Sequence, residues 1–351
     1  MELLFSKIPP LHTMGKDTAC MFEELMGNSV GIKIASGFIT DTSLLELKNI
    51  AEMNKKQFTE LIIGMHGFSG FTQSQYEAAV YLDNYLRESK TGEVKISHSF
   101  KFHGKIYCFF GKESEPFGGI IGSSNLSSVL DYQNNYETDV FINEKEMLTG
   151  INKFLTEMSQ KACVPLKDFK PKIIEDNNLL LEGHDGTEKV NNKDLLHVFA
   201  ERSAVSFKIP IKCEEKSNLN AYFGLGRINK KGFYKPRHWY EVELIVPKNI
   251  TEDKNYPKAG YPDKESVIKV FTDDGWSFRC KISGDYSKNF RSDNDLKILG
   301  RWIKGRLEAK GALKVGKKVT EEVLKKYGRD NIELIGTKDP DTWILDFGVS
   351  K

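Results

Sequence analysis

The first half of the chain alternates apolar runs with amphipathic segments. Five apolar runs are typical of buried strands: 30–39, 60–67, 94–100, 105–111 and 137–143. Three segments carry apolar residues at helical spacing: 41–53, 73–90 and 144–161. Asp41 stands where it would cap the first of these helices. Strands that alternate with helices predict an α/β layered domain with a mixed sheet.

The alternation of predicted strands and helices ends after the last of these helices, and a different pattern follows. Residues 166–200 mix proline, glycine, asparagine and charges without a period, so we expect a linker there. Beyond it, five short runs predict strands: 238–246, 266–272, 277–284, 332–336 and 342–347. Two helices are predicted at 296–310 and 320–328, the second ending at Gly328. We therefore predict an α/β domain over 1–165 and a β-rich, barrel-like domain over 201–351.

Composition fits this two-domain organisation. The chain has 351 residues, of which 39% are hydrophobic and 28% are charged, which is typical of a folded protein. Its apolar runs fall short of the roughly 20 residues that cross a membrane, and its start does not resemble a secretory signal. Five scattered cysteines without a CxxC pair favour neither a disulfide framework nor a zinc site. A cytoplasmic location is therefore expected.

The two halves of the chain differ in charge. Residues 1–170 carry a net charge of −4 and residues 171–351 carry +6. A polyanion such as a nucleic acid would therefore meet the C-terminal half first. An imbalance of this size also arises by chance, so it supports a nucleic-acid partner only weakly.

The strongest chemical signal lies between residues 101 and 137. His103 and Lys105 are two residues apart, so on a strand they face the same side. Asn125 closes the run Gly122-Ser123-Ser124-Asn125, and Glu137 follows twelve positions later. A neutral histidine can attack phosphorus, and a carboxylate can fix its tautomer. Lysine and asparagine donate to the phosphate oxygens, so such a site requires neither a metal ion nor another cofactor.

Each part of this pattern also has an ordinary interpretation. A histidine two residues before a lysine occurs by chance in many chains, and a Gly-Ser-Ser-Asn run is most often a turn. A single glutamate at a strand end is usually solvated. Their order on adjacent predicted strands favours a catalytic site.

The run His103-x-Lys105 followed by Gly122-Ser-x-Asn125 resembles the signature of the phospholipase D superfamily. The resemblance implies that His103 is the nucleophile or the general acid. It also implies that Lys105 and Asn125 bind phosphate, that Ser123 supports them and that Glu137 orients the histidine. The sequence departs from the family at Phe110, where an aspartate is common, and this favours a nuclease branch over a lipid phosphodiesterase.

The chain contains one such motif, whereas the superfamily site uses two histidines, one to attack and one to protonate the leaving oxygen. His66 lies between glycines and is either a pocket residue or, more simply, a loop residue. A two-fold homodimer with one His103 from each subunit meets the requirement economically.

Two stretches of the C-terminal half interleave cations with aromatics, 217–240 and 273–295. Cations neutralise phosphates, and arginine or asparagine can read base edges. A solvated basic β-surface would have the same composition. The candidate DNA contacts are Asn220, Tyr222, Arg227, Lys235, Arg237, Trp276, Arg279, Tyr286, Lys288, Asn289 and Arg291.

Taken together, the two halves resemble metal-independent restriction endonucleases of the BfiI and NgoFVII type. The resemblance implies a phospholipase D-like nuclease and dimerisation domain followed by a DNA-binding pseudobarrel related to the plant B-three fold. It implies cleavage of double-stranded DNA through a phosphohistidine, at a distance from a short recognition sequence. Some relatives act with a separate helicase-like ATPase subunit. Two alternatives stay open, a lipid or non-specific phosphodiesterase and a DNA-binding protein with an inactive nuclease domain.

Overall fold

The computed structural model describes residues 1–7, 11, 14–130, 135–175, 181–230, 232–258 and 265–349. The chain divides into two compact units. Unit 1 comprises Met1–Asp176 together with the short segment Gly226–Pro236, and unit 2 comprises Asn177–Leu225 and Arg237–Lys351.

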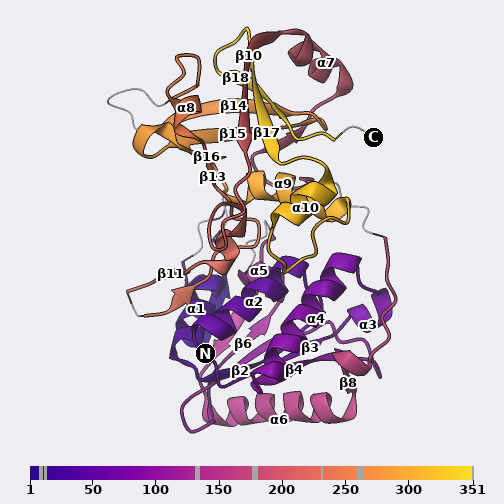
Figure 1. The fold of residues 1–351 in the computed structure, drawn as a ribbon. Helices are drawn as coiled ribbons and strands as arrows, with labels where there is room; N and C mark the ends of the chain where they lie inside the picture. Colours follow the sequence, from indigo (N-terminus) through magenta and orange to yellow (C-terminus); the bar gives the residue numbers. More distant parts are fainter. Residues whose placement is uncertain are drawn as a thin grey trace. The chain divides into compact units, whose positions relative to one another are not determined.

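In the described residues, unit 1 is built on a mixed sheet with the strand order β1-β7-β6-β5-β2-β3-β4-β8. Figure 1 shows this sheet with helices around it. Strands β2, β3 and β4 run parallel, and the other neighbours are antiparallel. The bounds are β1 Glu2–Phe5, β2 Gly31–Ser36, β3 Phe58–Ile63, β4 Gly92–Ser97, β5 Lys105–Phe110, β6 Pro116–Gly122, β7 Thr138–Ile142 and β8 Cys163–Pro165. The predicted mixed sheet is thus confirmed.

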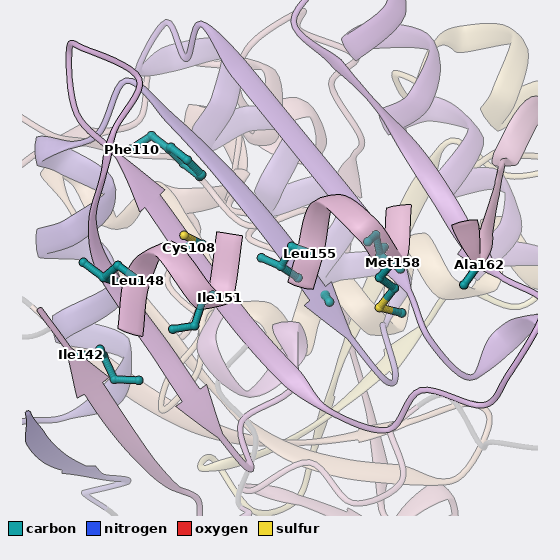
Figure 2. Close-up of a cluster of buried hydrophobic side chains, with 10 residues drawn as sticks. Cys108, Phe110, Ile142, Leu148, Ile151, Leu155, Met158 and Ala162 are labelled. Carbon is teal, nitrogen blue, oxygen red and sulfur yellow. The ribbon is translucent and has the colours of Figure 1, made fainter. Parts of the chain in front are cut away.

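Helices cover both faces of this sheet because its central strands are apolar on both sides. Along β5, Tyr107 and Phe109 meet Phe22 of α1 edge to face. The alternate residues Cys108 and Phe110 belong to the core beneath α6, which lies on the opposite face (Figure 2). The helices are α1 Thr18–Asn28, α2 Asp41–Met53, α3 His66–Ser69, α4 Gln73–Glu88, α5 Leu126–Leu130 and α6 Lys145–Lys161, and η1 spans Leu166–Asp168.

Unit 2 contains a curled sheet in the order β10-β17-β18-β14-β15-β16-β13, with β9 paired to β15. The strands are β9 Thr187–Lys189, β10 Arg202–Pro210, β13 Leu244–Ile245, β14 Ser266–Thr272, β15 Trp276–Ser283, β16 Asn289–Ser292, β17 Asn331–Thr337 and β18 Thr342–Asp346. The helical segments are α7 Asn192–Ala200, η2 Asn218–Phe223, α8 Lys248–Thr251, η3 Asp285–Ser287, α9 Lys297–Ala309 and α10 Glu321–Tyr327. The predicted β-rich pseudobarrel with a few helices is confirmed.

A small hairpin from the second half of the sequence belongs to unit 1. Its strands are β11 Arg227–Ile228 and β12 Tyr234–Lys235. Asn54 at the end of α2 pairs with the backbone of Tyr234 through both amide atoms, at 2.9 Å each. The buried Phe233 packs beside Gly27 of α1.

Three details of the sequence-based prediction need correction. The cap of α2 is Thr40, whose hydroxyl accepts from the Ser43 N–H at 3.1 Å, and Asp41 is the first helical residue. The strand predicted over 238–246 is confined to β13, because the segment before it packs against α9 instead of a neighbouring strand. Residues 166–200 contain β9 and α7, and residues 176–180 of that stretch lie outside the described part.

Candidate active site

His103 and Lys105 lie where the chain enters β5. His103 is exposed in the loop just before the strand, and Lys105 is the buried first residue of the strand. The Lys105 Nζ atom stands 3.3 Å from the Nδ1 atom of His103. Because a lysine ammonium can only donate, Nδ1 is the acceptor in this contact. The two side chains lie together, but His103 precedes β5, so the strand alternation assumed in the sequence analysis does not include it.

Two glycines let the histidine loop lie close to the ends of neighbouring strands. A Cβ atom on Gly37 would stand 3.1 Å from the His103 Cα atom, and one on Gly64 would overlap the Phe102 carbonyl. The Gly37 N–H donates to the Gly104 carbonyl at 3.0 Å. These contacts fix His103 at the end of the sheet where β2 and β3 terminate.

Asn125 reaches the same end of the sheet from the turn after β6. Its Oδ1 atom accepts from the Phe38 N–H at 3.1 Å and lies 3.5 Å from the Ser36 hydroxyl. Ser36 is also the register partner of Lys105 across β2 and β5. No described residue bonds the Asn125 Nδ2 atom, so its two N–H groups remain available to a substrate.

Glu137 lies directly before β7 and is buried among serines. Its carboxylate accepts from the Ser123 hydroxyl at 2.5 Å and the Ser128 hydroxyl at 2.8 Å. The Ser123 Oγ atom in turn accepts from the Thr138 N–H at 2.9 Å. In the described residues, the carboxylate makes no hydrogen bond to His103, so the predicted orienting role of Glu137 stays a prediction.

Lys105 is the buried cation of the site, and its pKa lies below the ordinary value for a lysine. Burial lowers the pKa of its ammonium, while the nearby carboxylates of Glu137 and Asp139 raise it. Asp139, on β7, was not among the predicted residues, because a single aspartate in a strand carries no signal in the sequence. Ser128, on α5, was also not predicted, because a serine in a helix gives no sign that it bonds Glu137.

His66 is buried near this end of the sheet but has no free nitrogen. Its Nε2 atom lies 3.3 Å from the Ile39 N–H, and its Nδ1 atom lies 2.8 Å from the Gly70 carbonyl. The two partners fix a neutral tautomer in which Nε2 accepts and Nδ1 donates. Burial also lowers the pKa of His66. His66 is the buried first residue of α3 and is held by these two contacts, so it is not the loop residue of the simpler interpretation.

The arrangement suits attack on a phosphodiester. An exposed imidazole stands beside an ammonium, and an amide lies at the same end of the sheet. The ammonium and the amide both have N–H groups to donate to phosphate oxygens. Among the described residues, no group of three or more histidines, cysteines or carboxylates is placed to hold a metal ion. None of the helices in the described ranges is long and apolar enough to cross a membrane.

Three predicted DNA contacts lie in the interior of unit 2, and the prediction is corrected there. The Asn220 side chain donates to the Glu214 and Val319 carbonyls and accepts from the Val319 N–H, at 2.8 Å each. Tyr222 and Trp276 are also buried. These residues hold the domain together and have no surface to offer DNA.

The other predicted contacts reach the surface in different places. Arg227 and Lys235 belong to the hairpin in unit 1, where Lys235 pairs with Glu23. In unit 2, Arg237 pairs with Glu241 and the exposed Arg279 lies 3.4 Å from Asp293. The remaining four form the β15–β16 turn and the start of β16: Tyr286, Lys288, Asn289 and Arg291.

The β15–β16 turn has features typical of a contact surface. Tyr286 is 83% exposed and adopts a left-handed backbone with φ of 60°, which is uncommon for a tyrosine. Asn289 Oδ1 is buried and no described residue hydrogen-bonds it, whereas the buried Arg291 Nε lies 3.9 Å from the Glu243 carboxylate. An uncommon backbone conformation and a buried polar atom without a hydrogen bond are both found at binding sites.

Two family models match the chain. Residues 16–167 match the NgoFVII restriction endonuclease N-terminal PLD domain, and residues 197–338 match the NgoFVII C-terminal B3-like DNA-binding domain. The chain belongs to the NgoFVII family of restriction endonucleases. It therefore combines a nuclease domain of the phospholipase D type with a B3-like DNA-binding domain, as the sequence predicts.

Solved structures resemble part of the chain at low identity. The archaeal chromatin protein TrmBL2 is 16% identical over 46% of this chain with a TM-score of 0.30, and the match spans 53% of its own length. Nuc from Salmonella typhimurium, a phospholipase D family member, is 10% identical over 49% of this chain and 97% of its own, with a TM-score of 0.33. NucT from Helicobacter pylori is 18% identical over 42% of this chain and 90% of its own, with a TM-score of 0.30. A search of curated proteins found no match.

Proposed function

We propose that the protein is a type II-like restriction endonuclease whose nuclease domain hydrolyses a DNA phosphodiester through His103 without a metal ion. The observation that carries this proposal is the convergence of His103, Lys105 and Asn125 at one end of the unit 1 sheet. Unit 2 binds a short duplex sequence and so brings DNA to the nuclease domain.

The chemistry follows from the side chains present. A nitrogen of His103 attacks phosphorus, the bond from phosphorus to the 3′ oxygen breaks, and a phosphohistidine forms. Lys105 and Asn125 donate to the non-bridging oxygens, where negative charge accumulates. A second imidazole protonates the leaving oxygen and then removes a proton from the water that attacks phosphorus and breaks the P–N bond. The products carry a 5′-phosphate and a 3′-hydroxyl.

The second imidazole is best supplied by another copy of the chain. His66 has both nitrogens engaged, so it has no proton to exchange with a substrate. A two-fold axis beside His103 would bring the same residue from a partner into one shared site. The proposal therefore includes a homodimer, and a separate helicase-like ATPase subunit is not required by this chemistry.

Cleavage is expected to persist when divalent ions are removed. With EDTA in excess, the protein should cut plasmid DNA into discrete fragments as fast as with Mg²⁺. The reason is that Lys105 and Asn125, and not a metal ion, stabilise the negative charge on the non-bridging phosphate oxygens. Gel electrophoresis over time measures the rate, with His103→Ala as the inactive control. Cleavage that stops in EDTA and returns with Mg²⁺ would contradict the mechanism. Specific binding without cleavage in either buffer would favour an inactive nuclease domain.

Arg279 tests the recognition part of the proposal. Arg279→Ala is expected to weaken binding to the target sequence by about 1–3 kcal/mol while leaving non-specific binding nearly unchanged. Lys269→Ala is a matched control, because Lys269 is the exposed register partner of Arg279 on β14. Titrations with target and scrambled duplexes give both affinities. Equal weakening on both duplexes would make Arg279 a phosphate contact.

A further inference from the structure

Asp139 is a buried carboxylate beside the active site that the mechanism above does not use. It is 2% exposed on β7. Its Oδ2 atom accepts from the hydroxyls of Ser124 at 2.6 Å and Thr18 at 2.8 Å, and its Oδ1 atom accepts from the Ser124 N–H at 3.0 Å. A buried charge costs several kcal/mol unless it is well bonded, so this placement requires a reason.

Two of the three hydrogen bonds to Asp139 come from Ser124, the residue between Ser123 and Asn125. Ser124 is buried, and its carbonyl accepts from the Tyr107 hydroxyl at 2.8 Å. Its N–H, carbonyl and hydroxyl are therefore all held, two of them by one carboxylate. This fixed backbone places Ser123 and Asn125, whose side chains are then held by Glu137 and by the Phe38 N–H.

Gly122 shows how closely Asp139 approaches the turn. A Cβ atom at Gly122 would overlap the Asp139 Oδ1 atom. A Cβ atom there would also overlap the Thr138 carbonyl, so β7 and the Asp139 carboxylate together require glycine at this position. Asp139 and Gly122 are also register partners across β6 and β7.

We propose that Asp139 is a positioning residue of the nuclease site, which holds the Ser123–Asn125 turn so that Asn125 faces the phosphate beside His103 and Lys105. This inference rests on the proposed function. Asp139 does not touch the substrate and acts through Ser124. Its charge also acts on Lys105, because Asp139 and Glu137 both raise the pKa that burial lowers.

Asp139→Asn tests the proposal, because it keeps the shape of the side chain and removes its charge. We expect kcat to fall about 10- to 100-fold with little change in KM, since the turn shifts relative to the attacking histidine. The alkaline limb of the kcat–pH profile should move to lower pH, because Lys105 loses a neighbouring negative charge and deprotonates sooner.

Asp83→Asn is the matched control. Asp83 is another buried carboxylate of unit 1, bonded to the Val94 N–H and Arg87 on α4 and β4. It should lower the thermal midpoint but leave kcat and its pH profile unchanged. If Asp139→Asn behaves like Asp83→Asn, Asp139 is only structural and the proposal fails.

Ser124→Ala keeps the test decisive if Asp139→Asn does not fold. It removes the 2.6 Å bond without changing charge. We expect a smaller loss of kcat and an unshifted alkaline limb, and an unchanged kcat would overturn the inference. Failure of the wild-type protein to cleave DNA would instead overturn the proposed function, so the two failures are distinct.

Discussion

DNA cleavage by a His103→Ala variant is expected to fall by at least about 10⁴-fold, because the variant lacks both the nucleophile and the proton donor of the proposed shared site. His103 is exposed and makes one side-chain hydrogen bond in the described structure, to Lys105, so its removal should cost little stability. Single-turnover cleavage of a plasmid with one target site measures the loss.

Two controls separate this chemical effect from damage to the protein. His98→Ala removes another exposed histidine of unit 1 and should leave the cleavage rate unchanged. His103→Ala itself should bind the target duplex as tightly as the wild-type protein does. A His103→Ala variant that cleaves within tenfold of the wild-type rate would show that another group attacks phosphorus.

Lys105→Met is expected to lower kcat by about 10²–10³-fold, because it removes a positive charge aimed at the oxygens of the transition state. Methionine fills most of the buried volume, so the strand should persist. Lys105→Arg should recover only part of the rate, since a guanidinium cannot occupy the position of a compact ammonium.

Steady-state kinetics with a duplex oligonucleotide separate binding from chemistry for Lys105. Lys101→Met is the control, because Lys101 is exposed in the same loop. A rise in KM with kcat unchanged would mean that Lys105 binds the ground state and the transition state equally. That result would remove it from the mechanism.

The sequence singled out side chains that the structure places at one end of the unit 1 sheet, but it did not single out the groups that hold them. His103, Lys105 and Asn125 stand out because unusual residue types occur in order on adjacent strands. Asp139 and Ser124 carry no such signal, since their role depends on which strands become neighbours. A register between β6 and β7 cannot be inferred from the spacing of two short segments.

The fold of unit 1 was more predictable than the surface of unit 2. Strands such as β5 are apolar on both faces and therefore stand out from the helices around them. In unit 2, composition could not tell which aromatics face inward, so Tyr222 and Trp276 were taken for surface residues. Near residue 240, alternation suggested a strand, but the close approach of Gly300 in α9 to the Tyr240 carbonyl shows helix packing instead.

A dimer that carries one wild-type chain and one His103→Ala chain tests the central claim most directly. The two chains receive different affinity tags, are co-expressed and are purified through both tags, with a doubly tagged wild-type dimer as reference. A shared site needs both histidines, so the mixed dimer should cleave no faster than the His103→Ala homodimer. Two independent sites would instead leave the mixed dimer with about half the reference rate, and that result would contradict the account.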